Sequence, residues 1–171
     1  MTYPNCPPES MDARSALELA QTAKARFETT EAAAESYGLD AERVKACGNS
    51  LLDQIHRGPQ QENVMWVIEI AVAMITAVMA VNREPLPVAQ QVDPASYAMS
   101  VLRDLATAAR EKGMPWTDLE TAAADCLRQA DADGYTNQEV YWALNRAIAS
   151  LELAWARSLA DDGGNPFTVT P

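Results

Sequence analysis

The fold follows from residues 64–81, VMWVIEIAVAMITAVMAV, a stretch whose only polar side chains are Glu69 and Thr76. On a helix these two fall in line with Glu62 and Arg83, because the four positions recur every seven residues. One narrow polar stripe remains, and the rest of the surface is apolar. A helix of this kind must be covered by other helices or by a second subunit, so we expect it at the centre of a helical domain.

Composition and charge limit the classes of function. The 171 residues fit one domain with enough chain to bury a core without disulfides. The formal charge of −11 argues against nucleic acid or an anionic membrane as the direct partner. Residues 64–81 approach the roughly 20 that cross a bilayer. However, Glu69 interrupts them, and no aromatic belt or one-sided Lys/Arg cluster flanks them. We expect neither nucleic acid nor membrane as partner.

The cysteines and the first residues indicate a cytoplasmic protein. Cys6, Cys47 and Cys126 are odd in number, widely spaced and without a Cys-x-x-Cys pair, which is typical of free thiols in a reducing compartment. The opening MTYPNCPPES has no basic segment and no apolar run. Residues 1–9 are therefore expected to be a flexible leader rather than a signal peptide.

Three helices are expected before a proline-rich linker. Ser10 is the expected cap of a helix that reaches about Tyr37, and Gly38 follows where helices end. Asp40 is the expected cap of a second helix that ends near His56. The apolar stretch 64–81 is the third. Residues 83–93, REPLPVAQQVD, carry two prolines and no helical period, which favours a linker.

Three more helices are expected after the linker. Asp93-Pro94 has a capping carboxylate followed by proline at the first helical position, and this helix should stop at Gly113. Two capping boxes, at residues 117–120 and 136–139, predict the starts of the fifth and sixth helices. The fold class is thus all-α: a six-helix bundle in a single domain over residues 10–160, followed by a flexible tail, residues 161–171.

The two halves of the chain have glycines and tryptophans at matching positions. Gly38 and Gly113 are 75 residues apart, and Trp66 and Trp142 are 76 apart. Matching residues surround the tryptophans, which favours a duplication of a three-helix unit, residues 10–82 and 94–160. The alternative is a chance similarity between Ala-rich helices that end in glycine.

Most enzyme signatures are absent from the sequence. There is one histidine, His56, and no phosphate-binding glycine loop or Gly-x-Ser-x-Gly motif. The segment Asp131-Ala-Asp133-Gly134 has the acidic spacing of the middle of a calcium loop, but Gln129 and Val140 stand where that loop needs its first and last carboxylates. We expect no catalytic residue, no metal and no cofactor.

The remaining functional signal is an acidic stretch from residue 117 to 145, in which Arg128 is the single cation. Trp116 precedes it and could anchor an interface. An acidic patch steers and docks a basic partner. The expected partner-binding residues are Trp116, Asp118, Glu120, Asp125, Asp131, Asp133 and Glu139.

We therefore expect a non-catalytic, acidic protein-binding module that uses the hairpin of the fifth and sixth helices. An inhibitor or immunity protein, an adaptor and a phage antagonist are concrete forms. Three alternatives stay open: a homodimer through the apolar helix 64–81, an enzyme that uses buried carboxylates such as Glu69, and an acidic stretch that is only a solvated face.

Overall fold

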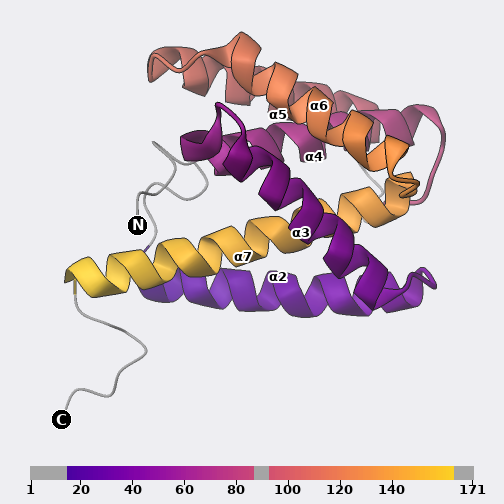
Figure 1. Ribbon diagram of the computed structural model, residues 1–171, viewed down its shortest axis with the longest axis horizontal. Helices are drawn as coiled ribbons and strands as arrows, with labels where there is room; N and C mark the ends of the chain where they lie inside the picture. Colours follow the sequence, from indigo (N-terminus) through magenta and orange to yellow (C-terminus); the bar gives the residue numbers. More distant parts are fainter. Residues whose placement is uncertain (1–14, 87–92, 164–171) are drawn as a thin grey trace.

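The structure, a computed structural model, describes residues 15–86 and 93–163, and within these ranges it contains six α-helices, one 3-10 helix and no strand (Figure 1). The expected all-α class is confirmed for this part of the chain. The helices are α2 (Ala16–Ser36), α3 (Ala41–Arg57), η1 (Gln61–Asn63), α4 (Val64–Val81), α5 (Pro94–Glu111), α6 (Trp116–Ala132) and α7 (Asn137–Gly163). The expected leader, Ser10, linker residues 87–92 and tail residues 164–171 lie outside the described ranges.

Several helix boundaries agree with the sequence prediction. The helix α4 spans the whole apolar stretch. Asp40 caps α3 by accepting from the Glu42 amide at 3.0 Å. Asp93 caps α5, and its hydrogen bonds with Ser96 hold the pKa of its carboxyl below the usual value. The box at the start of α7 is reciprocal: the Glu139 amide donates to Thr136 Oγ1 at 3.1 Å, and the Thr136 amide donates to Glu139 Oε1 at 2.9 Å.

Three expected boundaries are wrong. The helix α2 begins at Ala16 and not after Ser10, because Ser15 and Glu18 form a capping box there. The helix α6 begins at Trp116, because the Pro115 carbonyl already accepts the amides of Asp118 and Leu119, each at 3.1 Å. The expected capping box at residues 117–120 therefore lies inside the helix. The helix α7 continues to Gly163, past the expected end near residue 160, since Asp interrupts a helix far less than Gly or Pro does.

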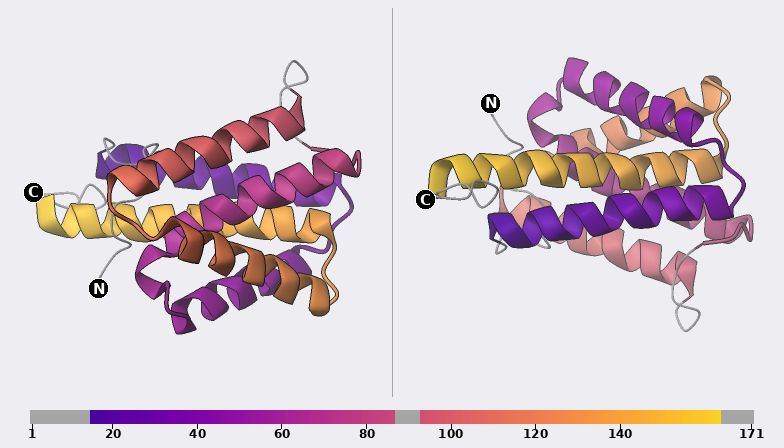
Figure 2. Two further views of the ribbon diagram at one scale, coloured as in Figure 1. Left: turned by 90° about the horizontal axis from the view of Figure 1, so that it is seen from above. Right: turned by 90° about the horizontal axis from the view of Figure 1, so that it is seen from below.

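Of the six helices, α4 and α7 pack on each other at the centre, and the other four are arranged around them (Figure 1). The helix α2 lies along α7, and α5 lies along α4. The helix α3 packs on α7, and α6 packs on α4. Figure 2 shows α3 and α6 on one side of the molecule and α2 and α5 on the other. Each outer helix of one half of the chain therefore covers the central helix of the other half.

The core of the protein is built on α4. Trp66, Ile68 and Ile70 are fully buried, and most other side chains of the helix are also inaccessible. Thr76 is buried as well, and its hydroxyl donates to the Val72 carbonyl at 2.6 Å, so the helix satisfies this polar group itself. Glu69 is partly buried. The expected central, covered position of the apolar helix is confirmed.

The segment Gln61–Val81 is long and apolar enough to cross a membrane, and 61% of its most apolar 18-residue window is buried inside the protein. Length and composition alone do not separate a membrane span from a buried core helix. This property is therefore weak support for a membrane span.

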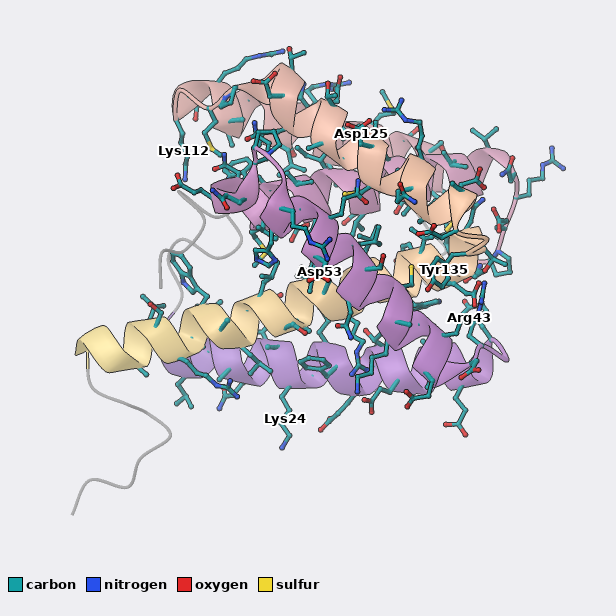
Figure 3. The ribbon with its side chains drawn as sticks, in the orientation of Figure 1. Lys24, Arg43, Asp53, Lys112, Asp125 and Tyr135 are labelled. Atoms are coloured by element: carbon teal, nitrogen blue, oxygen red, sulfur yellow. The ribbon has the colours of Figure 1, made fainter. Side chains whose placement is uncertain are left out.

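Ion pairs attach α7 to its neighbours. Arg26 on α2 donates to the buried Glu152 at 2.7 Å. Arg43 on α3 donates to the buried Glu139 at 2.5 Å and to the Gly134 carbonyl at 2.9 Å. Its guanidinium also lies 4.7 Å from the centroid of the Tyr135 ring, and Figure 3 shows the two side chains together beside the turn between α6 and α7.

Gly48 sets the distance between α3 and α7. A Cβ at this position would lie 3.2 Å from the Ala143 carbonyl oxygen, which is closer than most Cβ contacts in proteins. The absence of a side chain therefore allows the backbone of α3 to touch the backbone of α7.

Candidate interaction groove

The helices α3 and α6 border two adjoining hollows, which we call the α3/α6 groove. The larger hollow has a volume of about 530 Å³ and the smaller one about 150 Å³. Gln54 and Gly58 line both, so the hollows adjoin at these two residues. The other residues that line the larger hollow are Ser50, Asp53, Arg57, Gln129 and Asp133. The other residues that line the smaller hollow are Ile55, Pro59, Gln60, Ala122, Asp125 and Cys126.

Charged side chains lie along the rim of the groove. Figure 3 shows Asp125 on α6 and Asp53 on α3 on the same side of the molecule. Asp53 pairs with Arg57 at 3.0 Å, and Asp125 pairs with Arg128. Both pairs join residues of one helix and are largely exposed, so each contributes little to stability and can exchange partners readily.

The walls of the smaller hollow are mostly apolar. Ile55, Pro59 and Ala122 contribute carbon surface, and Cys126 is almost fully buried beside them. Burial raises the pKa of the Cys126 thiol to about 11, so this thiol is protonated at neutral pH and is a poor nucleophile. The polar groups of the wall are Gln54, Gln60 and Asp125.

Gln54 is the unusual polar group of the groove. Its Oε1 atom is buried and has no hydrogen-bond partner among the described residues, and its amide nitrogen has none there either. Most buried polar atoms are paired, so an unpaired one is a candidate for binding a ligand.

The structure divides the expected partner-binding residues of α6 into two groups. At about 100° per residue, Asp118, Asp125 and Asp133 lie on the flank toward α3, and the last two line the groove. Glu120 and Asp131 are also exposed, but they lie on the opposite flank of the buried face. The expected single acidic patch is therefore two separate acidic flanks.

Two other expected residues are less accessible than the prediction requires. Glu139 is 5% exposed, and its carboxylate binds Arg43 and caps α7, so its expected place in a surface patch is wrong. The reason is Arg43, which lies far away in the sequence. Trp116 is partly buried and packs against the core, and it is the first residue of α6 rather than a residue ahead of the helix cap. Because nearly all described side chains of α7 are buried or partly buried, the exposed part of the expected hairpin is mainly α6.

The contribution of α3 to the groove was not predicted from the sequence. Ser50, Asp53 and Gln54 follow the helical period beside the buried stripe of this helix. That pattern is the same for any solvated helix face, so only the packing of α3 beside α6 distinguishes these residues.

The chemistry of the described residues is limited. Among residues 15–86 and 93–163, no group of three or more His, Cys, Asp or Glu side chains is placed to hold a metal ion. Burial, together with the charge of Glu139, raises the pKa of Cys47 to about 12. His56 lies in the last turn of α3, as expected, and it is exposed.

Comparisons with known proteins give no relative from which a function could be transferred. No family model matches the chain, and the searches of curated proteins and of solved structures also found no match. The interpretation of the groove therefore depends on its own residues.

Proposed function

We propose that the protein is a non-catalytic, acidic, cytoplasmic interaction module that binds a basic segment of a partner protein in the α3/α6 groove. One observation carries this proposal: Asp125 and Asp133, both expected to bind a partner, line the same hollowed surface together with α3. The formal charge of −11 would attract a basic partner from a distance. An inhibitor or immunity protein, an adaptor and a phage antagonist are the forms that fit.

We further propose that the fold arose by duplication of a three-helix unit, α2–α4 and α5–α7. The contacts support this, because α2 packs on α7 as α5 packs on α4, and α3 packs on α7 as α6 packs on α4. The helices α2 and α5 also end in the same way, with Gly38 and Gly113 both at φ +71°. In this arrangement α3 and α6 meet at the pseudo-two-fold axis, which places the groove there.

Contacts of single residues support the same relation. Tyr37 at the end of α2 packs on Trp142 with ring centroids 5.9 Å apart. Lys112 at the end of α5 lies 6.0 Å from the centroid of Trp66. The correspondence stops at the next turn, where Gly58 has φ −87° and Gly134 has φ +87°. Gly58 precedes Pro59, which favours an extended conformation.

Self-association through α4 receives less support than docking in the groove. The helix α4 is covered along most of its length, and Val78 and Val81 near its end are its exposed large apolar side chains. A homodimer would therefore have to use the last turns of α4 only. Sedimentation at high concentration tests this alternative.

The docking proposal is tested with two double variants of equal charge change. Asp125→Lys/Asp133→Lys reverses the groove flank of α6, and Glu120→Lys/Asp131→Lys reverses the opposite flank. The measurement is the anisotropy of a labelled peptide of alternating Gly, Lys and Arg. We expect the groove variant to weaken binding roughly tenfold more than the control variant, because only its charges face the bound peptide.

Circular dichroism should show that both variants keep the native helical content, because all four side chains are exposed. Equal losses in the two variants would mean that the peptide responds only to net charge. Absence of binding to the native protein would overturn the proposal.

A further inference from the structure

We infer that the smaller hollow of the α3/α6 groove is a binding site for a single arginine side chain of the partner. This inference rests on the proposed function and makes it more specific, since it names the residue type that is recognised. The observations that carry it are the size of the hollow, its apolar walls and the polar groups Gln54 and Asp125.

The size and walls of the hollow fit one long side chain. Its volume of about 150 Å³ is below the range of roughly 300–1,000 Å³ that is typical of sites for small-molecule ligands and cofactors. The apolar surface of Ile55, Pro59 and Ala122 matches a chain of methylene groups. Arginine and lysine bury such a stem and keep a charged end beside polar groups.

The Gln54 amide can accept a hydrogen bond from the charged end. Its Oε1 is buried without a partner among the described residues, which is an unfavourable arrangement for an acceptor. Gln54 lines the hollow, and turning its amide so that Oε1 meets a donor there breaks no hydrogen bond to the described part of the chain, although it moves the NH2 group to the buried position. A cationic donor in the hollow would then satisfy the amide oxygen.

Asp125 supplies the negative charge. It belongs to the lining of the smaller hollow, and its present pair with Arg128 is exposed and within one helix. A guanidinium from a partner can therefore replace Arg128 at little cost. Its flat fork of five donors can bind the carboxylate and the Gln54 oxygen together, whereas an ammonium group is a point charge on a flexible stem. This difference favours arginine over lysine.

The test uses amide NMR of the full chain with three probes of similar size: the blocked single residues of arginine, lysine and citrulline. Citrulline has nearly the shape of arginine but lacks its charge. We expect arginine to shift the backbone amide of Gly58 and the side-chain amide of Gln54, and to bind roughly tenfold more tightly than citrulline. Lysine should give the same shifts with lower affinity.

Two variants of Gln54 and one control locate the site. Gln54→Leu removes the acceptor and should weaken arginine binding roughly tenfold, whereas Gln54→Glu adds a charge and should strengthen it. Gln129→Leu, a change in the larger hollow, should leave the affinity for arginine unchanged. The two leucine variants remove the same amide group and so serve as a matched pair.

The outcomes separate this inference from the proposed function. If the basic peptide still binds in the groove but arginine and citrulline bind equally, or Gln54→Leu has no effect, the arginine site is wrong and the docking proposal stands. If arginine binds as described but the charge reversals leave peptide binding unchanged, the docking proposal fails alone. If neither probe binds, both are overturned.

Discussion

The two central helices, α4 and α7, are both buried, yet they are held by different interactions. The helix α4 is covered by α5 and α6 almost entirely through apolar side chains. The helix α7 is covered by α2 and α3, and it carries the buried carboxylates Glu139 and Glu152. Each carboxylate pairs with an arginine of a covering helix.

This difference shows that two buried helices of one fold can be held by different interactions, one by apolar contacts and the other also by buried ion pairs. Apolar packing gives α4 its stability without fixing a unique partner surface, because it is non-directional. Ion pairs fix which residue meets which, but burying charge costs much of what the pairing gains. We therefore expect the packing of α4 to contribute more to the free energy of unfolding than the ion pairs of α7. For each of these ion pairs, removing one partner should destabilise the protein more than removing both.

The largest effect is expected for the tryptophans. Trp66→Ala should lower the free energy of unfolding by about 3–5 kcal/mol, because Trp66 is fully buried. Trp142→Phe should cost less than Trp66→Phe, since the Trp142 indole N–H is buried without an acceptor among the described residues. Denaturant unfolding of the variants measures both. Equal losses for the two phenylalanine variants would show that the indole N–H has no influence.

A smaller effect is expected for the ion pair on α7. Arg26→Leu leaves Glu152 buried without that guanidinium and should cost about 2–3 kcal/mol, somewhat below the usual loss because Arg26 is 35% exposed. Adding Glu152→Leu should recover most of the loss. Thr76→Val removes the buried hydroxyl of α4, which bonds only within its own helix, and should cost less than about 1 kcal/mol. A double variant as unstable as the single one would contradict this account.

The smallest effect at neutral pH is expected for the buried thiols. The pKa of Cys47 is raised from 9.0 to about 12 by burial and by Glu139, and that of Cys126 to about 11 by burial alone. Because the folded pKa lies above the unfolded one, each protonated thiol stabilises the fold fully below pH 9, and this contribution is lost as pH rises toward the folded value.

The two thiols should therefore differ in their alkaline range. Cys47→Ala should reduce the decrease in the free energy of unfolding between pH 9 and about pH 12. Cys126→Ala should reduce it only between pH 9 and about pH 11. Unfolding curves between pH 8 and pH 12 measure the slopes. Identical curves for the two variants would contradict the higher pKa of Cys47.

The sequence predicted the helices well because local signals determine most of their boundaries. The apolar run of α4 predicts a buried helix. Asp40, Asp93 and the Thr136–Glu139 pair are helix caps formed by residues close in the sequence. The start of α6 was wrong because Pro115 competes with Thr117 for the same role, and the sequence does not rank them.

The groove could be predicted only in part. Asp125 and Asp133 were found from charge alone, since an acidic run is visible in the sequence. The share of α3 was missed, and Glu139 was assigned to the surface, because both depend on contacts between residues more than 70 positions apart. Local pattern carries no information about which helices become neighbours.

The contact at Gly48 has a consequence for how freely the outer surface can vary. Because α3 rests there on the main chain of α7, its placement does not depend on which side chains it presents to solvent. Substitutions at Ser50, Asp53 or Gln54 can therefore alter what the surface recognises while the scaffold beneath stays in register. Such a separation allows specificity to diverge without rebuilding the protein.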